Sequence, residues 1–188
     1  ASSYNGASPI YDDEAKMVYV GLENSTLKGT MAALDIENGD IVWEFSTNSH
    51  VPSRPAIGKN ILIFGSNDCF VYALDKRNGK LLWKFRTDGE VKGRLTIDGN
   101  LCYTTSFDGF LYCLELLTGN LVWKRKLGAK LFSEPLIINN KVIVGSYSGQ
   151  LTALDKKTGK VFWFFMANGP IQSYPSFSGG LVFFGSHD

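Results

Sequence analysis

The sequence predicts an all-β fold, a β-propeller built from four-stranded antiparallel blades of about 40 residues each. The first observation is a strict internal repeat, because consecutive tryptophans are 40 residues apart along the whole chain. Such a constant period is typical of an array whose units bury their faces against one another. The tryptophans are Trp43, Trp83, Trp123 and Trp163.

The second observation is the strand pattern within one unit. In the second unit four short runs rich in β-branched and aromatic residues are separated by Gly, Asn or Asp, which predicts strands joined by hairpin turns. These runs cover residues 54–57, 60–66, 70–75 and 81–85. No segment of the chain has the periodicity of a long amphipathic helix.

The third observation is that the inner strands are apolar at consecutive positions, as in residues 61–64, 142–144 and 181–184. Both faces of each sheet are therefore expected to be covered. Radial stacking of blades satisfies this requirement, whereas a β-sandwich buries only one face of each sheet. We expect one incomplete propeller domain over residues 1–188. Its blades are expected near residues 8–47, 48–87, 88–127 and 128–167, with half a blade at 168–188.

A turn with an acid at its start and a glycine at its end precedes each tryptophan. The acid can accept backbone N–H groups of the turn, and glycine provides the positive φ that other residues adopt at a cost of about 1 kcal/mol or more. We interpret these residues as structural rather than as a ring of cation ligands, and the tryptophans as packing anchors between blades. They are Asp35, Asp75, Glu115 and Asp155, and Gly39, Gly79, Gly119 and Gly159.

Composition excludes some partners and chemistry. Nineteen basic and eighteen acidic residues give a net charge of +1 without a block of either sign, so nucleic acid is not an expected partner. No apolar stretch is long enough to span a bilayer. The three cysteines lack metal-ligand and haem-attachment spacing. If Asp108-Gly109 is a two-residue turn, Cys102 and Cys113 lie diagonally on one sheet face, an arrangement that disfavours a disulfide.

A possible ligand site lies in the first strand of each unit. The residue before the proline position differs chemically from unit to unit, as Arg54, Arg94, Glu134 and Tyr174. If this strand lines the central channel, these side chains form a partly cationic mouth at which two arginines could hold a carboxylate or a phosphate. Alternatively, the arginines pair with Glu134 and other polar groups of the strands.

The motif Ala-Leu-Asp-x-x-[Thr/Asn]-Gly-x-x-x-Trp occurs at residues 33–43, 73–83 and 153–163. With it, the chain resembles the pyrroloquinoline-quinone-like (PQQ-like) repeat family. The first unit departs by about six inserted residues, around Asp12-Asp13 and residues 23–28. The third unit departs by substitution and is expected to be less regular. Its substituted residues are Leu95, Thr105, Cys113 and Glu115.

The resemblance implies a propeller of seven or eight blades, completed by further blades or by a second chain. It also implies an extracytoplasmic or periplasmic location, although the odd number of cysteines leaves the cytoplasm open. The family includes quinoprotein alcohol and glucose dehydrogenases and non-catalytic propellers such as the lipoprotein subunit of the outer-membrane β-barrel assembly machinery. In the alcohol dehydrogenases an adjacent cysteine pair, calcium-binding carboxylates and an aspartate base accompany the quinone.

None of those catalytic features can be assigned in this chain, so we predict no catalytic residue, no metal ligand and no cofactor. The favoured hypothesis is a non-catalytic binding or assembly scaffold that takes a protein partner or a small anionic ligand on a propeller face. The alternative is a fragment of a PQQ-dependent dehydrogenase for alcohols or sugars, with PQQ and Ca²⁺ held by residues of missing blades.

Overall fold

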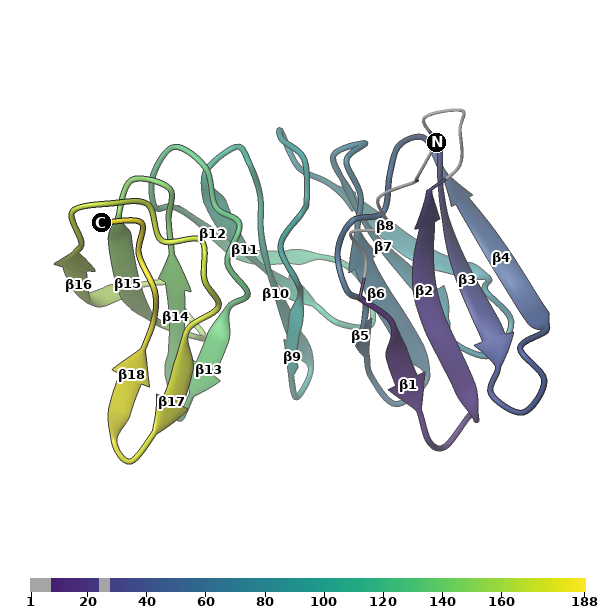
Figure 1. Ribbon diagram of the computed structural model, residues 1–188. Helices are drawn as coiled ribbons and strands as arrows, with labels where there is room; N and C mark the ends of the chain where they lie inside the picture. Colours follow the sequence, from purple (N-terminus) through teal and green to yellow (C-terminus); the bar gives the residue numbers. More distant parts are fainter. Residues whose placement is uncertain (1–7, 24–27) are drawn as a thin grey trace.

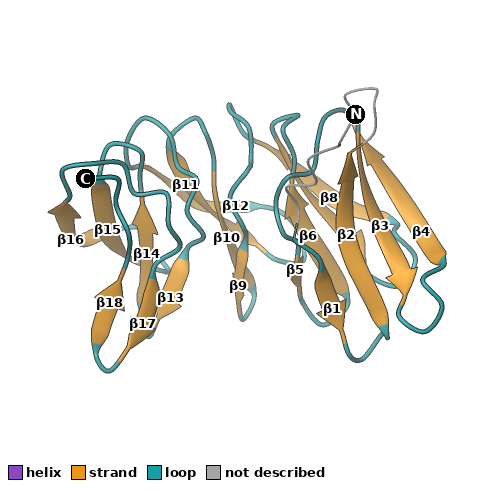
Figure 2. Cartoon of the chain, viewed as in Figure 1, coloured by secondary structure: helices purple, strands orange, loops and turns teal. Residues whose placement is uncertain are grey.

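The computed structural model describes residues 8–23 and 28–188, and in these residues it contains strands and no helix (Figure 2). The first sheet consists of β1 (Ile10–Asp12), β2 (Met17–Glu23), β3 (Gly29–Asp35) and β4 (Ile41–Thr47). The second consists of β5 (Ala56–Ile57), β6 (Ile61–Gly65), β7 (Phe70–Asp75) and β8 (Leu81–Arg86). The third consists of β9 (Thr96–Asp98), β10 (Leu101–Thr105), β11 (Phe110–Glu115) and β12 (Leu121–Lys126).

The fourth sheet consists of β13 (Leu136–Ile138), β14 (Lys141–Gly145), β15 (Gln150–Asp155) and β16 (Val161–Met166). A two-stranded sheet follows, with β17 (Ser176–Ser178) and β18 (Leu181–Phe183). Every sheet is antiparallel and has its strands in chain order, which confirms the predicted four-stranded units. In Figure 1 the sheets stand side by side along an arch, with β1–β4 at one end and β17–β18 at the other.

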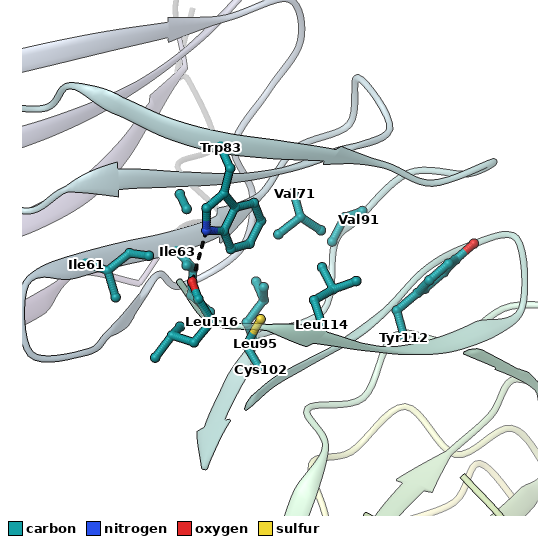
Figure 3. Packing of buried hydrophobic residues seen from close by; sticks show 11 residues of the cluster. Ile61, Ile63, Val71, Trp83, Val91, Leu95, Cys102, Tyr112, Leu114 and Leu116 are labelled. Carbon is teal, nitrogen blue, oxygen red and sulfur yellow. Dashed lines mark hydrogen bonds between the residues drawn. The ribbon is translucent and has the colours of Figure 1, made fainter. Parts of the chain in front are cut away.

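The hydrophobic core lies between neighbouring sheets rather than inside any one of them. One buried cluster joins Tyr19 and Trp43 of the first sheet to Leu62 and Phe64 of the second. The next, drawn in Figure 3, combines residues of the second and third sheets. Because each inner sheet contributes to a cluster on both of its faces, its strands are apolar at consecutive positions, as expected.

The tryptophans connect each sheet to the next. The indole Nε1 of Trp83 donates a hydrogen bond to the carbonyl oxygen of Leu116 in the following sheet, at 2.9 Å (Figure 3). Gly119, in the same turn as Leu116, has a φ of +72°, and a Cβ on it would lie 2.6 Å from the Trp83 ring. Glycine is therefore required there both by the backbone conformation and by the close approach of the indole.

The same arrangement recurs on either side of that sheet pair. Trp43 donates to the carbonyl oxygen of Lys76, and Trp123 to that of Lys156, each at 3.1 Å. Trp163 has no following four-stranded sheet in the structure and is 40% exposed, whereas Trp83 is 8% exposed. The indoles thus pack where a following blade is present to receive them.

The acidic side chains of the turns accept hydrogen bonds from groups of the same turn. Oδ1 of Asp35, Asp75 and Asp155 accepts the backbone N–H two residues later, at 2.8, 2.9 and 3.0 Å. Glu115, whose side chain is one methylene longer, instead accepts from the hydroxyl of Thr118 at 2.6 Å.

The third sheet is as regular as its neighbours, so the expected irregularity is wrong. Its strands β9 to β12 pair with the same register as β13 to β16. In the second sheet the Ser53 hydroxyl bonds both the N–H and the carbonyl of Gly65, at 3.0 and 3.1 Å. In the third sheet Gly93 stands at the serine position and Thr105 at the glycine position, and Thr105 Oγ1 donates to the Ser133 carbonyl at 3.0 Å. The two substitutions compensate each other.

The predicted pairing of the cysteine strands is also wrong, by one residue. The loop between β10 and β11 has four residues, 106–109, with Gly109 at a φ of +84°, and not the two-residue Asp108-Gly109 turn. Cys102 therefore lies opposite Leu114, and Cys113 opposite Tyr103. A shift of one residue reverses the face to which every side chain points. The two thiols consequently belong to different hydrophobic clusters, and all three cysteines are free.

Candidate functional site

The four residues predicted at the channel mouth precede the innermost strands instead of lying within them. The strand predicted from Arg54 begins only at Ala56, and the Ser53 hydroxyl bonds the backbone groups of Gly65. Arg94, Glu134 and Tyr174 likewise stand shortly before β9, β13 and β17. Since β9 lies against both β5 and β13, these segments are neighbours in space.

Arg94 is held by the equivalent residues of the next two units. Its Nη1 lies 3.6 Å from Oε2 of Glu134, and its guanidinium carbon lies 4.6 Å from the centre of the Tyr174 ring. Ion pairing and cation–π stacking thus act together on one side chain. The structure brings these three predicted residues into one cluster, and for Arg94 the pairing alternative holds.

Arg54 is different, because among the described residues it forms no ion pair and its Nε has no acceptor. That nitrogen is buried although the side chain as a whole is only partly so. Arginine stays protonated at any ordinary pH, so its charge is permanent. A buried donor without a partner costs about 1–3 kcal/mol.

Two cavities meet at Arg54 and Arg94. The first, of about 240 Å³, also contains Thr96 and Glu134 in its lining. The second, of about 180 Å³, is lined by three cations and no acid, together with two aromatic rings. Its lining residues are Ser8, Pro52, Ser53, Arg54, Lys92, Arg94, Phe132 and Tyr174.

Five of those residues were not anticipated from the sequence, namely Ser8, Pro52, Ser53, Lys92 and Phe132. Lys92 and Phe132 occupy the position two residues before Arg94 and Glu134, and the 40-residue step that located the arginines would have located them too. Ser8 stands at the Arg54 position of the first unit, because Ile10 pairs with Tyr19 as Thr96 pairs with Tyr103. The first unit appeared displaced because its β1–β2 turn is two residues longer. The remainder of its insertion includes residues 24–27, which lie outside the described part of the chain.

The lining residues do not fit a calcium-bound quinone. Ca²⁺ takes six to eight oxygen ligands, several of them carboxylates. Glu134 is the one acid that lines either cavity, and it already faces Arg94. Over residues 8–23 and 28–188, no three His, Cys, Asp or Glu side chains gather in a way that could hold a metal ion.

Comparison with known families shows to which family the chain belongs. A family model of PQQ-like repeats, described as "Outer membrane protein assembly factor BamB", matches residues 8–128 and 67–188. The chain belongs to this family. Its sheets are therefore blades of a β-propeller, as the sequence predicts, and the total number of blades stays a prediction.

Solved propellers support the fold of this BamB-like family member. The crystal structure of BamB from Moraxella catarrhalis has a TM-score of 0.80 and 21% identity, over 94% of this chain and 57% of that one. The computationally designed Ika8 protein has a TM-score of 0.81 and 19% identity, over 95% of this chain and 54% of that one. The designed Ika4 protein has a TM-score of 0.64 and 20% identity, over 71% of this chain and 83% of that one.

The chain therefore spans little more than half the length of the first two propellers. No curated protein matched the sequence. The described residues also include no helix long and apolar enough to cross a membrane.

Proposed function

We propose that this chain is part of a non-catalytic β-propeller scaffold that binds a protein partner through the outer strands of its blades. The observation that carries the proposal is the match of both halves of the chain to the family of the assembly factor BamB. A propeller suits a binding module, because each blade is held by contacts that lie between blades and its outer surface is free to contact a partner.

The outer strands supply the surface. The first two residues of each outer strand are apolar and exposed: Leu81 and Leu82 are 39% and 50% exposed in β8, and Leu121 and Val122 are each 44% exposed in β12. Since these pairs recur at the 40-residue step, they lie at the same height on neighbouring blades. Recurrent exposed apolar side chains of this kind mark interaction sites.

The charge of the same strands indicates what the partner carries. After the apolar pair, β8 and β12 expose only basic residues and no acid. These are Lys84, Arg86, Lys124, Arg125 and Lys126. A partner with acidic side chains beside an apolar patch is complementary to this surface.

A paired substitution tests the proposal in the whole natural protein. Cross-linking and mass spectrometry in cells would identify partners of the wild type. The Leu82→Asp, Val122→Asp variant should lose a partner that the Tyr11→Asp variant keeps, because Tyr11 is similarly exposed at 47% but lies in the inner strand β1. Identical cross-links in both variants would contradict the surface assigned here.

The alternative as a quinoprotein dehydrogenase is tested separately. The scaffold proposal predicts that the whole protein, supplied with PQQ and calcium, does not reduce an acceptor dye in the presence of alcohols or sugars. Substrate-dependent dye reduction would overturn it.

A further inference from the structure

We propose that the second of the two cavities binds a small oxyanion, a carboxylate or a phosphate, on the guanidinium of Arg54. This site is independent of the outer strands to which the protein partner is assigned. The lining of the cavity carries Arg54, Lys92 and Arg94 without an acid.

The three cations differ in how far their charge is already compensated. Arg94 faces Glu134 at 3.6 Å, and Lys92 forms an ion pair with Oε2 of Glu90 at 2.8 Å. Arg54 alone of the three has no ion pair among the described residues, so its charge is the least compensated in the lining. Its permanent charge and its planar set of donors match an incoming carboxylate or phosphate, which can accept two parallel hydrogen bonds.

The surroundings strengthen that interaction. The cavity is partly enclosed by Pro52, Phe132 and Tyr174, which lower the local dielectric constant and so increase the attraction between an anion and the guanidinium. Arg94, stacked on Tyr174, lines the same cavity and supplies a second positive charge.

The size of the cavity limits the ligand. A volume of about 180 Å³ is enough for an inorganic phosphate or a small carboxylate. Ser8, which stands at the equivalent position of the first unit, also lines the cavity and has a short neutral side chain. The ligand class is therefore a small free oxyanion.

The test is a calorimetric titration of the whole chain with inorganic phosphate, and separately with acetate, at constant ionic strength. The two titrations distinguish phosphate binding from carboxylate binding. We expect saturable binding of at least one probe, reduced tenfold or more by Arg54→Gln. Arg77→Gln is the matched control, since Arg77 is exposed in the turn after β7 and should leave the affinity unchanged.

A third variant keeps the test decisive if Arg54→Gln disturbs folding. Glu134→Gln removes the acid that competes for Arg94 and should raise the affinity several-fold. Absence of saturable binding of both probes in the wild type would overturn the proposal. Equal affinities in the wild type, Arg54→Gln and Glu134→Gln proteins would overturn it as well.

Discussion

Thr105 fills the space that a β-carbon on Gly93 would need. In the second and fourth blades the equivalent pairs are Ser53 with Gly65 and Ser133 with Gly145, so the small residue and the hydroxyl have changed places in the third blade. A third position changes with them. In the second and fourth blades the residues packed against Gly65 and Gly145 are Val91 and Ile171, which are branched at Cβ. In the third blade the equivalent residue is Leu131, which is unbranched at Cβ and so leaves room for Thr105.

The exchange predicts a strong coupling between the two positions. Gly93→Ser alone should destabilise the protein by about 1–3 kcal/mol, because its Cβ overlaps Thr105 Oγ1. Adding Thr105→Gly recreates the arrangement of the second blade and should recover much of that loss. Urea unfolding of the wild type, both single variants and the double variant measures the coupling. Simple additivity of the two single effects would show that the positions do not compensate.

Trp83→Phe should destabilise the protein by roughly 1–3 kcal/mol, because the buried carbonyl of Leu116 loses its donor. Trp163→Phe is the matched control and should cost less than about 1 kcal/mol, since this indole is 40% exposed. Chemical denaturation followed by circular dichroism compares the two. Equal losses would mean that the indole hydrogen bond contributes nothing specific.

Lys76→Met should cost about 3–5 kcal/mol at neutral pH, because it leaves Asp12 buried without its cation. The Nζ of Lys76 lies 2.8 Å from Asp12 Oδ2, and the two side chains are 3% and 6% exposed. Lys156→Met should cost less, since Lys156 and Asp98 are more exposed. Urea unfolding of both variants tests whether Lys76→Met lowers the free energy of unfolding more than Lys156→Met does.

The same pair predicts a pH dependence. Burial raises the pKa of Asp12, but the hydrogen bond and charge of Lys76 and two backbone N–H groups outweigh it and leave the pKa below its usual value. Asp12 therefore adds stability above about pH 4, the value in the unfolded chain, and this contribution is lost as pH falls through the lower folded pKa. The difference in the free energy of unfolding between the wild type and Lys76→Met should become smaller from pH 7 to pH 3. A gap that stays constant over this range would contradict the pairing.

Cys69→Gly should stabilise the protein by roughly 1 kcal/mol, the cost of a left-handed conformation for a residue with a side chain. Cys69 has a φ of +69°, and the equivalent residues Gly109 and Gly149 have φ values of +84° and +81°. Cys69→Ala keeps the strain and should bring no gain. Thermal unfolding of the two variants distinguishes the backbone effect from loss of the thiol.

The thiols should differ in reactivity. Burial raises the pKa of both Cys102 and Cys113 to about 12, so at pH 8 almost none of either is thiolate. Cys69 is the one cysteine that is partly exposed. A thiol-reactive dye at pH 8 should modify no more than one cysteine in the folded protein and all three in denaturant. Rapid modification of two thiols in the folded state would place Cys102 or Cys113 in contact with solvent.

Part of the site was within reach of the sequence and part was not. The 40-residue step picked out Arg54, Arg94, Glu134 and Tyr174, because equivalent positions of a repeat occupy equivalent places. It put them within the first strands, whereas they precede β5, β9, β13 and β17. The repeat could not show that Arg94, and not Arg54, pairs with Glu134 and stacks on Tyr174. That outcome depends on the reach and rotamers of side chains from three different blades.

The amino-acid sequence by itself determined the order of the strands and the turns that run from an acid to a glycine, because these depend mainly on interactions within a few residues. The positive φ of Gly79 and the hydrogen bond from Arg77 to Asp75 both form inside a single turn. Only the tertiary structure decided which face each thiol occupies, how Thr105 is accommodated, and which arginine of the site forms no ion pair within the described part of the chain. Those outcomes depend on contacts between atoms far apart in the chain, where a shift of one residue in a hairpin exchanges every neighbour.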